Sequence, residues 1–275
     1  MIRNRGARNR LILELCLLAW ALVVLVPFYM ILVNAFKDTG EAGRFGLGLP
    51  SEWKWDNFSV VFQKGKILRG YMNSALIAGC TLVLASLSAA LASFSIQRNN
   101  RRFTNFIYYL FVLGLVIPVA LIPTIKLMMS LHIHNTYPGM VMYYSAVLLP
   151  FSVFLLTGFL KTVTRELDDS AIIDGCGPIR MFAIVILPLL KPVMVTACLF
   201  IVMSVWNDFM GPFYLLSDSS KWTVTVSVFS YVNQFGTHWN LVFADILIVI
   251  TPVLVFYFFL QEHIVEGMTA GAVKG

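Results

Sequence analysis

Charged side chains are scarce in this sequence: they make up 12% of the 275 residues, whereas hydrophobic residues make up 59%. An average soluble domain carries about 25% charged residues. Long apolar runs alternate with short polar stretches, and roughly 20 apolar residues suffice for a helix to cross the hydrocarbon core of a bilayer. The scarcity of charge excludes an ordinary water-soluble domain and predicts a chain that lies mostly in a membrane.

Cysteine is also rare, and motifs for metal binding or hydrolysis are missing. Three of the four cysteines lie in apolar runs, Cys176 lies in a polar loop, and no C-x-x-C spacing occurs. This pattern predicts no disulfide framework and no zinc site. His132 and His134 are two positions apart, which points them to different faces of a helix. H-E-x-x-H and G-x-S-x-G are absent, so we expect neither a metal site nor an enzyme.

The apolar runs predict an all-α, polytopic membrane protein that forms a single transmembrane domain over residues 1–275. The first run, from Leu11 to about Phe36, is too long for the apolar region of a signal peptide, and no small-residue cleavage site closes it. We interpret it as a retained span. The six predicted transmembrane helices cover residues 11–36, 71–96, 106–129, 139–160, 192–215 and 241–260.

The distribution of Lys and Arg predicts that both termini are cytoplasmic. Twelve of the twenty basic residues lie in the termini and in the loops 97–105 and 161–191, and loops rich in Lys and Arg stay on the cytoplasmic side. The tail 261–275 is then cytoplasmic too. Because the basic residues lie in loops and not along one solvated face, the net charge of +6 does not indicate nucleic acid binding.

Most of the remaining basic residues lie in the loop that follows the first span, which we expect on the outer side. This loop also contains Trp53, Trp55, Pro50 and several glycines. That composition favours a folded cap at the membrane interface over a free linker.

The segment 161–191 is too organised for a simple connector. Between Glu166 and Ile173 acidic and apolar residues alternate at helical spacing, with carboxylates in the first turn, where they favour the helix dipole. Gly175 and Gly177 supply the freedom for a sharp bend, and Pro178 suits the first turn of a second helix. We expect two short helices that meet at an angle.

The second short helix is expected to run from Ile179 to about Leu187, where Pro188 ends it. Its apolar residues include Met181, Phe182 and Ile186, which predicts an apolar knob exposed outside the membrane.

Such a helix pair either docks a soluble partner or lies flat on lipid. A helix that lies on lipid normally carries Lys and Arg on its polar face. Here Glu166, Asp168, Asp169 and Asp174 dominate, and anionic lipid repels carboxylates. The charge pattern favours a docked protein.

The same residues resemble the coupling loop of ABC importer permeases, whose pattern is Glu-Ala-Ala, three residues, Gly, nine residues, Ile-x-Leu-Pro. Asp169, Ser170 and Ala171 stand in the first three places, Gly175 stands in the glycine place, and Ile186-Leu187-Pro188 stands near the end. Asp in place of Glu keeps the charge, and Ser in place of Ala keeps the size.

Two further stretches resemble the maltose-type sugar permeases, in particular their six-helix member. One is Trp206-Asn207-Asp208-Phe209 followed by Pro212, and the other is the ending Glu266–Gly275. The resemblance covers nearly the whole chain. It implies a type I ABC importer permease fold in a prokaryotic plasma membrane.

The resemblance also implies partners: a second, different permease, two ATPase subunits and an extracytoplasmic solute-binding protein that delivers a sugar. No G-x-x-x-x-G-K-[ST] phosphate loop occurs in the chain, so ATP and magnesium are expected on the ATPase subunits. ATP binding would then close the ATPase pair and rock the permeases between inward and outward openings.

The implied roles fall on four groups of residues. The residues implied to couple the chain to the ATPase are Glu166, Asp169, Ser170, Ala171, Asp174, Gly175, Leu187 and Pro188. The tail residues implied to reach the ATPase interface are Gly271 and Lys274. Asn207 and Asp208 are implied to line the translocation pathway. The residues implied to contact the binding protein are Tyr231, Asn233, Gln234 and Trp239. On composition alone, this last group favours an aromatic belt at the membrane interface, and it is the resemblance that points to the binding protein.

Two alternatives remain open at this point. Asp208 and Asp245 both lie in predicted spans, and paired intramembrane carboxylates can carry protons or sodium in an ion-coupled secondary transporter. Pro118 and Pro123 break the hydrogen-bond ladder of the predicted third span, which either shapes a pathway or simply kinks a packed helix.

Overall fold

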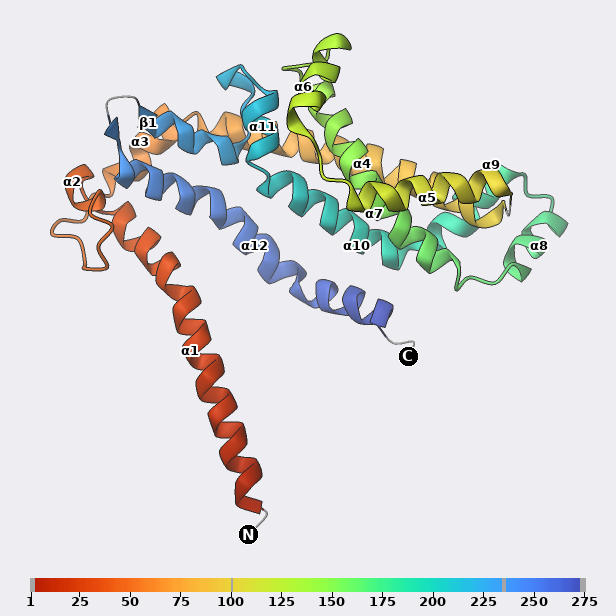
Figure 1. The fold of residues 1–275 in the computed structure, drawn as a ribbon, viewed down its shortest axis with the longest axis horizontal. Helices are drawn as coiled ribbons and strands as arrows, with labels where there is room; N and C mark the ends of the chain where they lie inside the picture. The colour runs from red at the N-terminus through yellow and green to blue at the C-terminus, as the bar shows by residue number, and fades with distance from the viewer. Residues whose placement is uncertain (1–2, 100, 234–235, 273–275) are drawn as a thin grey trace. The chain divides into compact units, whose positions relative to one another are not determined.

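The computed structural model describes residues 3–99, 101–233 and 236–272, with side chains for residue 10 and, within these ranges, for residues 12–255 except 233 (Figure 1). This part of the chain is helical apart from loops and one hairpin, in which β1 (Val232–Asn233) pairs antiparallel with β2 (Gly236–Thr237). It divides into two compact units, Met1–Leu68 with Ser227–Val255 and Arg69–Val226 with Phe256–Gly275.

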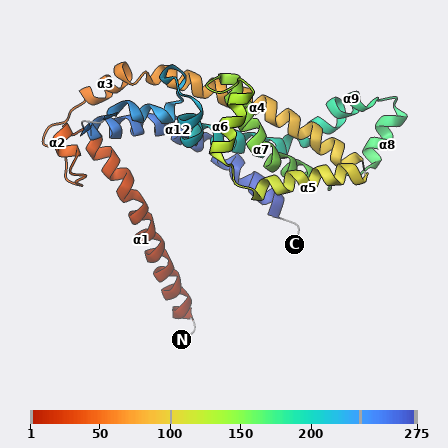
Figure 2. The same ribbon diagram turned by 45° about the horizontal axis from the view of Figure 1, so that its top comes forward.

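The first unit contains α1 (Arg3–Ala35), α2 (Thr39–Ala42), α3 (Asp56–Lys64) and the first half of α12 (Trp239–Ala272). Residues 12–35 of α1 have a mean hydropathy of 2.6, and only 6% of their most apolar window is buried. Figures 1 and 2 show α1 diverging from the first half of α12. A helix that is apolar all round and so little covered requires lipid or another protein around it.

The loop after α1 is folded, as its composition predicts. The Phe36 ring lies edge-on to Trp55, with ring centroids 4.7 Å apart. The buried side-chain amide of Asn57 donates to the carbonyl oxygens of Ala35, at 2.8 Å, and of Lys37, at 2.9 Å. These bonds satisfy backbone groups that the end of α1 leaves open. Together they form a cap that fixes α3 against the last turn of α1.

The second unit is a bundle built around α7 (Tyr137–Leu160), which packs against α5 (Arg102–Val116) and α10 (Leu187–Asn207). The bundle also contains α4 (Ile67–Arg98), α6 (Leu121–Ser130), α11 (Met210–Leu215) and the 3₁₀ turns η2 (Ser219–Lys221) and η3 (Val224–Tyr231), the last of which continues into the first unit. Small residues of α4 are buried, and Ser93 Oγ donates to the carbonyl oxygen of Val153 on α7 at 3.2 Å. Small side chains let membrane helices approach closely.

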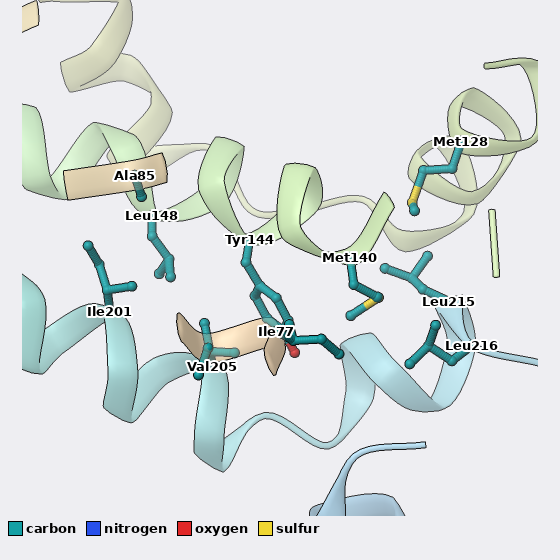
Figure 3. Packing of buried hydrophobic residues seen from close by; sticks show 11 residues of the cluster. Ile77, Ala85, Met128, Met140, Tyr144, Leu148, Ile201, Val205, Leu215 and Leu216 are labelled. Atoms are coloured by element: carbon teal, nitrogen blue, oxygen red, sulfur yellow. The ribbon is translucent and has the colours of Figure 1, made fainter. Parts of the chain in front are cut away.

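A hydrophobic cluster joins α4, α6, α7, α10 and α11 (Figure 3). Tyr144 extends from α7 between Ile77 of α4 and Val205 of α10, and Leu215 and Leu216 close the cluster beside Met140. These side chains are nearly or fully buried. The cluster fixes the point at which α10 ends and α11 begins.

Four helical stretches of the described chain are long and apolar enough to cross a membrane, and they overlap the predicted first, second, fourth and fifth spans. The predicted end of the fifth span at residue 215 is wrong, because α10 ends at Asn207 and α11 is a separate helix. The predicted continuous third span is wrong in detail, because residues 117–120 separate α5 from α6. Pro118 lies in this break, whereas Pro123 lies in the first turn of α6, where a missing N–H has no helical partner to lose. The predicted sixth span lies in α12, which stays helical to Ala272.

Candidate functional site

The first short helix of the segment 161–191 is α8 (Glu166–Ile173), which occupies the predicted residues. Its end is a Schellman motif: the N–H of Gly175 donates to the Ile172 carbonyl at 3.0 Å, and the N–H of Cys176 donates to the Ala171 carbonyl at 2.9 Å. Gly175 has φ +76°, in the left-handed region that favours glycine. The predicted bend is confirmed at this residue.

The second short helix is α9 (Pro178–Met181), with Pro178 in its first turn as predicted. It does not end at Pro188, and that prediction is wrong. A π turn, η1 (Phe182–Ile186), follows α9 and runs directly into α10, so residues 178–207 form one helix. Proline lacks an N–H and crowds the carbonyl four residues before it, and the wider π turn accommodates both effects.

The predicted apolar knob is also wrong. Met181 and Ile186 are buried and Phe182 is partly buried, all packed in a cluster with residues of α4, α7 and α10. The Phe182 ring lies 5.5 Å from the Phe94 ring of α4. Ala171 of α8 belongs to the same cluster. These side chains attach the segment to the transmembrane helices and do not face outward.

A different set of apolar side chains faces outward. Ile173 is 84% exposed and Ile179 is 85% exposed, and Ile172 is exposed beside them. They flank the bend at Gly175, where a Cβ would meet nothing within 4 Å. Among the predicted coupling residues, Glu166, Asp169, Ser170, Asp174, Gly175 and Pro188 are exposed, Leu187 is half-buried and Ala171 is buried. The segment therefore has one attached face and one open face that is apolar and acidic.

Sequence reasoning missed a buried ion pair that holds α8. Arg98 is the last residue of α4, and its Nε lies 2.6 Å from Oδ2 of Asp168 in the first turn of α8. The two side chains are only 11% and 12% exposed. The Arg165 guanidinium also donates to the Gln97 carbonyl at 3.4 Å. In the sequence, the only signal is a basic last turn on one helix and an acidic first turn on the other.

Asp208 lies between α10 and α11, and its carboxylate accepts hydrogen bonds from α7 and from the start of α11. Its Oδ2 accepts from the Tyr144 hydroxyl at 2.9 Å and from the Gly211 N–H at 3.1 Å, and its Oδ1 accepts from the Met210 N–H at 3.1 Å. The carboxylate thus satisfies the open N–H groups at the start of α11. Asn207 is exposed, and its amide donates to the Met203 carbonyl at 2.9 Å within α10.

Asp245 is fully buried in α12, where both carboxylate oxygens lie 3.0 Å from Ser227 Oγ. Tyr231, predicted to touch a binding protein, is buried as well, and its hydroxyl donates to the Val61 carbonyl at 3.1 Å. Burial, with the charge of Asp245, raises the pKa of Tyr231. Tyr231 supports the α3 end of the cap and is not presented to a partner.

The other predicted contact residues differ in placement. Trp239 is partly exposed at the start of α12, with its ring 4.8 Å from the Phe45 ring. Asn233 is described by its backbone in β1, opposite Gly236, and Gln234 lies outside the described residues. Of the two tail residues, Gly271 lies in the last turn of α12 and Lys274 lies outside the described residues.

Residues 81–270 match the protein family described as binding-protein-dependent transport system inner membrane component. This match covers the α8–α9 segment and most of the bundle that holds it. The chain belongs to this family and is therefore a transport permease subunit, not a stand-alone ion-coupled carrier.

Similar proteins are permeases of this kind. The chain is 29% identical, over 94% of its length and 87% of the relative, to the diacetylchitobiose uptake system permease protein NgcG of Streptomyces coelicolor. It is 31% identical, over 92% of its length and 93% of the relative, to AmyC of Thermoanaerobacterium thermosulfurigenes, a probable starch degradation products transport system permease protein. In fold it matches a chain of a bacterial ABC transporter involved in the import of the acidic polysaccharide alginate, with TM-score 0.81, 19% identity and coverage of 94% and 97%.

Proposed function

We propose that this chain is one permease subunit of an ATP-driven importer whose cargo is a sugar or oligosaccharide. Support comes from membership in the binding-protein-dependent family and from relatives that are named for diacetylchitobiose and for starch degradation products. A solute-binding protein outside the membrane delivers the cargo. Trp239, which is partly exposed in the first unit, contacts this binding protein.

The observation that carries the proposal is the open face of α8 and α9. Exposed isoleucines and carboxylates lie together on a segment whose opposite face is packed against α4, α7 and α10. An apolar surface of this kind favours a protein partner, and its acidic rim disfavours anionic lipid. We infer that an ATPase subunit binds this face, with Gly175 at the centre of the contact.

ATP and Mg²⁺ bind to two such ATPase subunits, because this chain contains no phosphate loop of its own. The excess of Lys and Arg in the termini and in the segment 161–191 supports a cytoplasmic location for the termini and for this segment. The ATPase subunits lie on the same side of the membrane. Gly271 and Lys274 then belong to a tail that reaches the ATPase pair.

A second, different permease completes the pathway. The poor burial of α1 supports such a partner, since its most apolar window is only 6% buried within this chain. A second permease would cover part of this helix and leave the rest to lipid.

The test compares how much ATPase co-purifies with the tagged wild-type chain and with a variant in which charged residues replace the exposed isoleucines of the open face. We expect the double variant Ile173→Glu/Ile179→Glu to lower ATPase recovery by about tenfold or more, because carboxylates would be buried against apolar groups. Leu47→Glu, at an exposed aliphatic residue of the cap loop, is the matched control and leaves recovery unchanged.

Function is measured in proteoliposomes with ATP inside, the binding protein outside, and either diacetylchitobiose or a starch hydrolysate as cargo. We expect uptake by the wild-type complex that requires ATP and is lost in the double variant. Full ATPase recovery and full uptake in the double variant would contradict docking at this face.

A further inference from the structure

Few apolar contacts attach α8, the helix that carries most of the open face, to the rest of the chain. Among its eight residues only Asp168 and Ala171 are buried, and the buried alanine offers a single methyl group. By contrast, the helix that follows is attached by Met181, Phe182 and Ile186. Something other than hydrophobic burial must therefore hold α8 in place.

The ion pair between Arg98 and Asp168 supplies that attachment. It joins the C-terminal end of α4 to the N-terminal end of α8, so each charge also lies at the helix end whose dipole favours it. The Arg98 guanidinium also donates to the Val163 carbonyl at 3.5 Å, in the connection that leads to α8. With the Arg165 bond to Gln97, all three polar contacts link the last two residues of α4 to residues 163–168.

Burial makes this link stiff. Water competes little for the pair, because both side chains are almost fully covered, and a buried charge that loses its partner is left uncompensated. The exposed pair of Glu52 and Lys54 in the cap loop is the opposite case, since water screens it.

We infer that the Arg98–Asp168 pair is the positioning link through which displacement of α8 reaches α4. This inference rests on the proposed function, because it takes the load on α8 to come from a bound ATPase. The pair touches neither ATP nor cargo. Its role is to make α8 and the end of α4 move as one body when the ATPases close.

The test measures the distance between spin labels on Leu91 of α4 and Leu167 of α8, both exposed, in the purified permease and ATPase complex with the four native cysteines replaced. Adenylyl imidodiphosphate with Mg²⁺ closes the ATPases. In the wild type we expect the same distance with and without nucleotide. In Asp168→Asn we expect a nucleotide-dependent change of more than about 2 Å, the scale of helix shifts at interfaces.

Charge exchange separates a positioning role from a folding role. The double variant Arg98→Asp/Asp168→Arg rebuilds the pair, so we expect it to restore the nucleotide-independent distance and a normal ratio of ATP hydrolysed to cargo taken up. Glu52→Gln breaks the exposed pair and leaves both readouts unchanged.

Several results would overturn the inference: a wild-type distance that changes with nucleotide, an Asp168→Asn variant that behaves as the wild type does, or single variants that lose the ATPase without recovery in the charge exchange. Failure of the proposed function is distinct, because the wild-type chain itself would then bind no ATPase.

Discussion

At the scale of single residues, the end of α8 depends on one backbone conformation. Gly175 has φ +76°, and both hydrogen bonds of the Schellman motif depend on it. The space around its Cβ position is open, so the constraint is conformational and not steric. This left-handed conformation costs free energy for residues other than glycine, and among them it costs asparagine least.

We therefore expect Gly175→Val and Gly175→Asn to differ. Valine strains the left-handed conformation by about 1 to 2 kcal/mol, should unwind the last turn of α8, and should lower ATPase recovery several-fold. Asparagine should retain most of the recovery. The measurement is ATPase co-purification, with hydrogen exchange of the residue 171–176 amides as a local readout. Equal loss in both variants would show that side-chain bulk at the contact matters more than conformation.

Local chemistry explains why some residues of the site were predictable and others were not. Gly175 and Pro178 act through their own backbone, so their neighbours in sequence were enough to predict the bend. Arg98 and Asp168 form their ion pair only after α4, α7 and α8 have packed, and no local sequence pattern predicts that they pair. Met181 and Ile186 were misjudged because hydrophobic residues on a short helix do not reveal which of two apolar surroundings they enter.

At the scale of elements, prolines were the main source of error. Pro118 was expected to break the hydrogen-bond ladder of one continuous span, but it lies in a break that separates α5 from α6. Pro188 was expected to end a helix, but it lies in a continuous one. A π turn depends on tertiary packing, here the contacts of Phe182 and Ile186 with the bundle, and propensity alone does not predict it. Long apolar helices such as α1 and α7 were predictable because their length and composition leave no alternative.

The contact between α5 and α7 depends on a glycine. A Cβ on Gly114 would lie 2.9 Å from Cγ of Pro150, whereas a Cβ on Gly158 of α7 would meet nothing within 4 Å. We expect Gly114→Ala to lower the melting temperature of the purified chain, because α5 must move away from α7. Gly158→Ala should leave it unchanged or raise it, since alanine favours a helix by about 1 kcal/mol over glycine. A melting temperature that is no lower for Gly114→Ala than for Gly158→Ala would contradict this close contact.

At the scale of the whole molecule, the chain is built to be one part of a larger assembly. Its first helix is barely covered within the chain, and its α8–α9 segment exposes isoleucines to whatever lies outside the bundle. Family membership defines the class of that assembly, and the exposed residues are where we propose that its partners bind. Composition predicted the membrane class, but only the structure separated the attached face of 161–191 from the open one.

The most direct measurement is photo-cross-linking from Ile173, the exposed residue next to the bend, with benzoylphenylalanine in the assembled importer. We expect a cross-link to the ATPase subunit, and none to that subunit from the same probe at Met181, which is buried against the bundle. A probe at Ile173 that reacts with lipid alone, or with nothing, would contradict the claim that this segment is where the ATPase drives the permease.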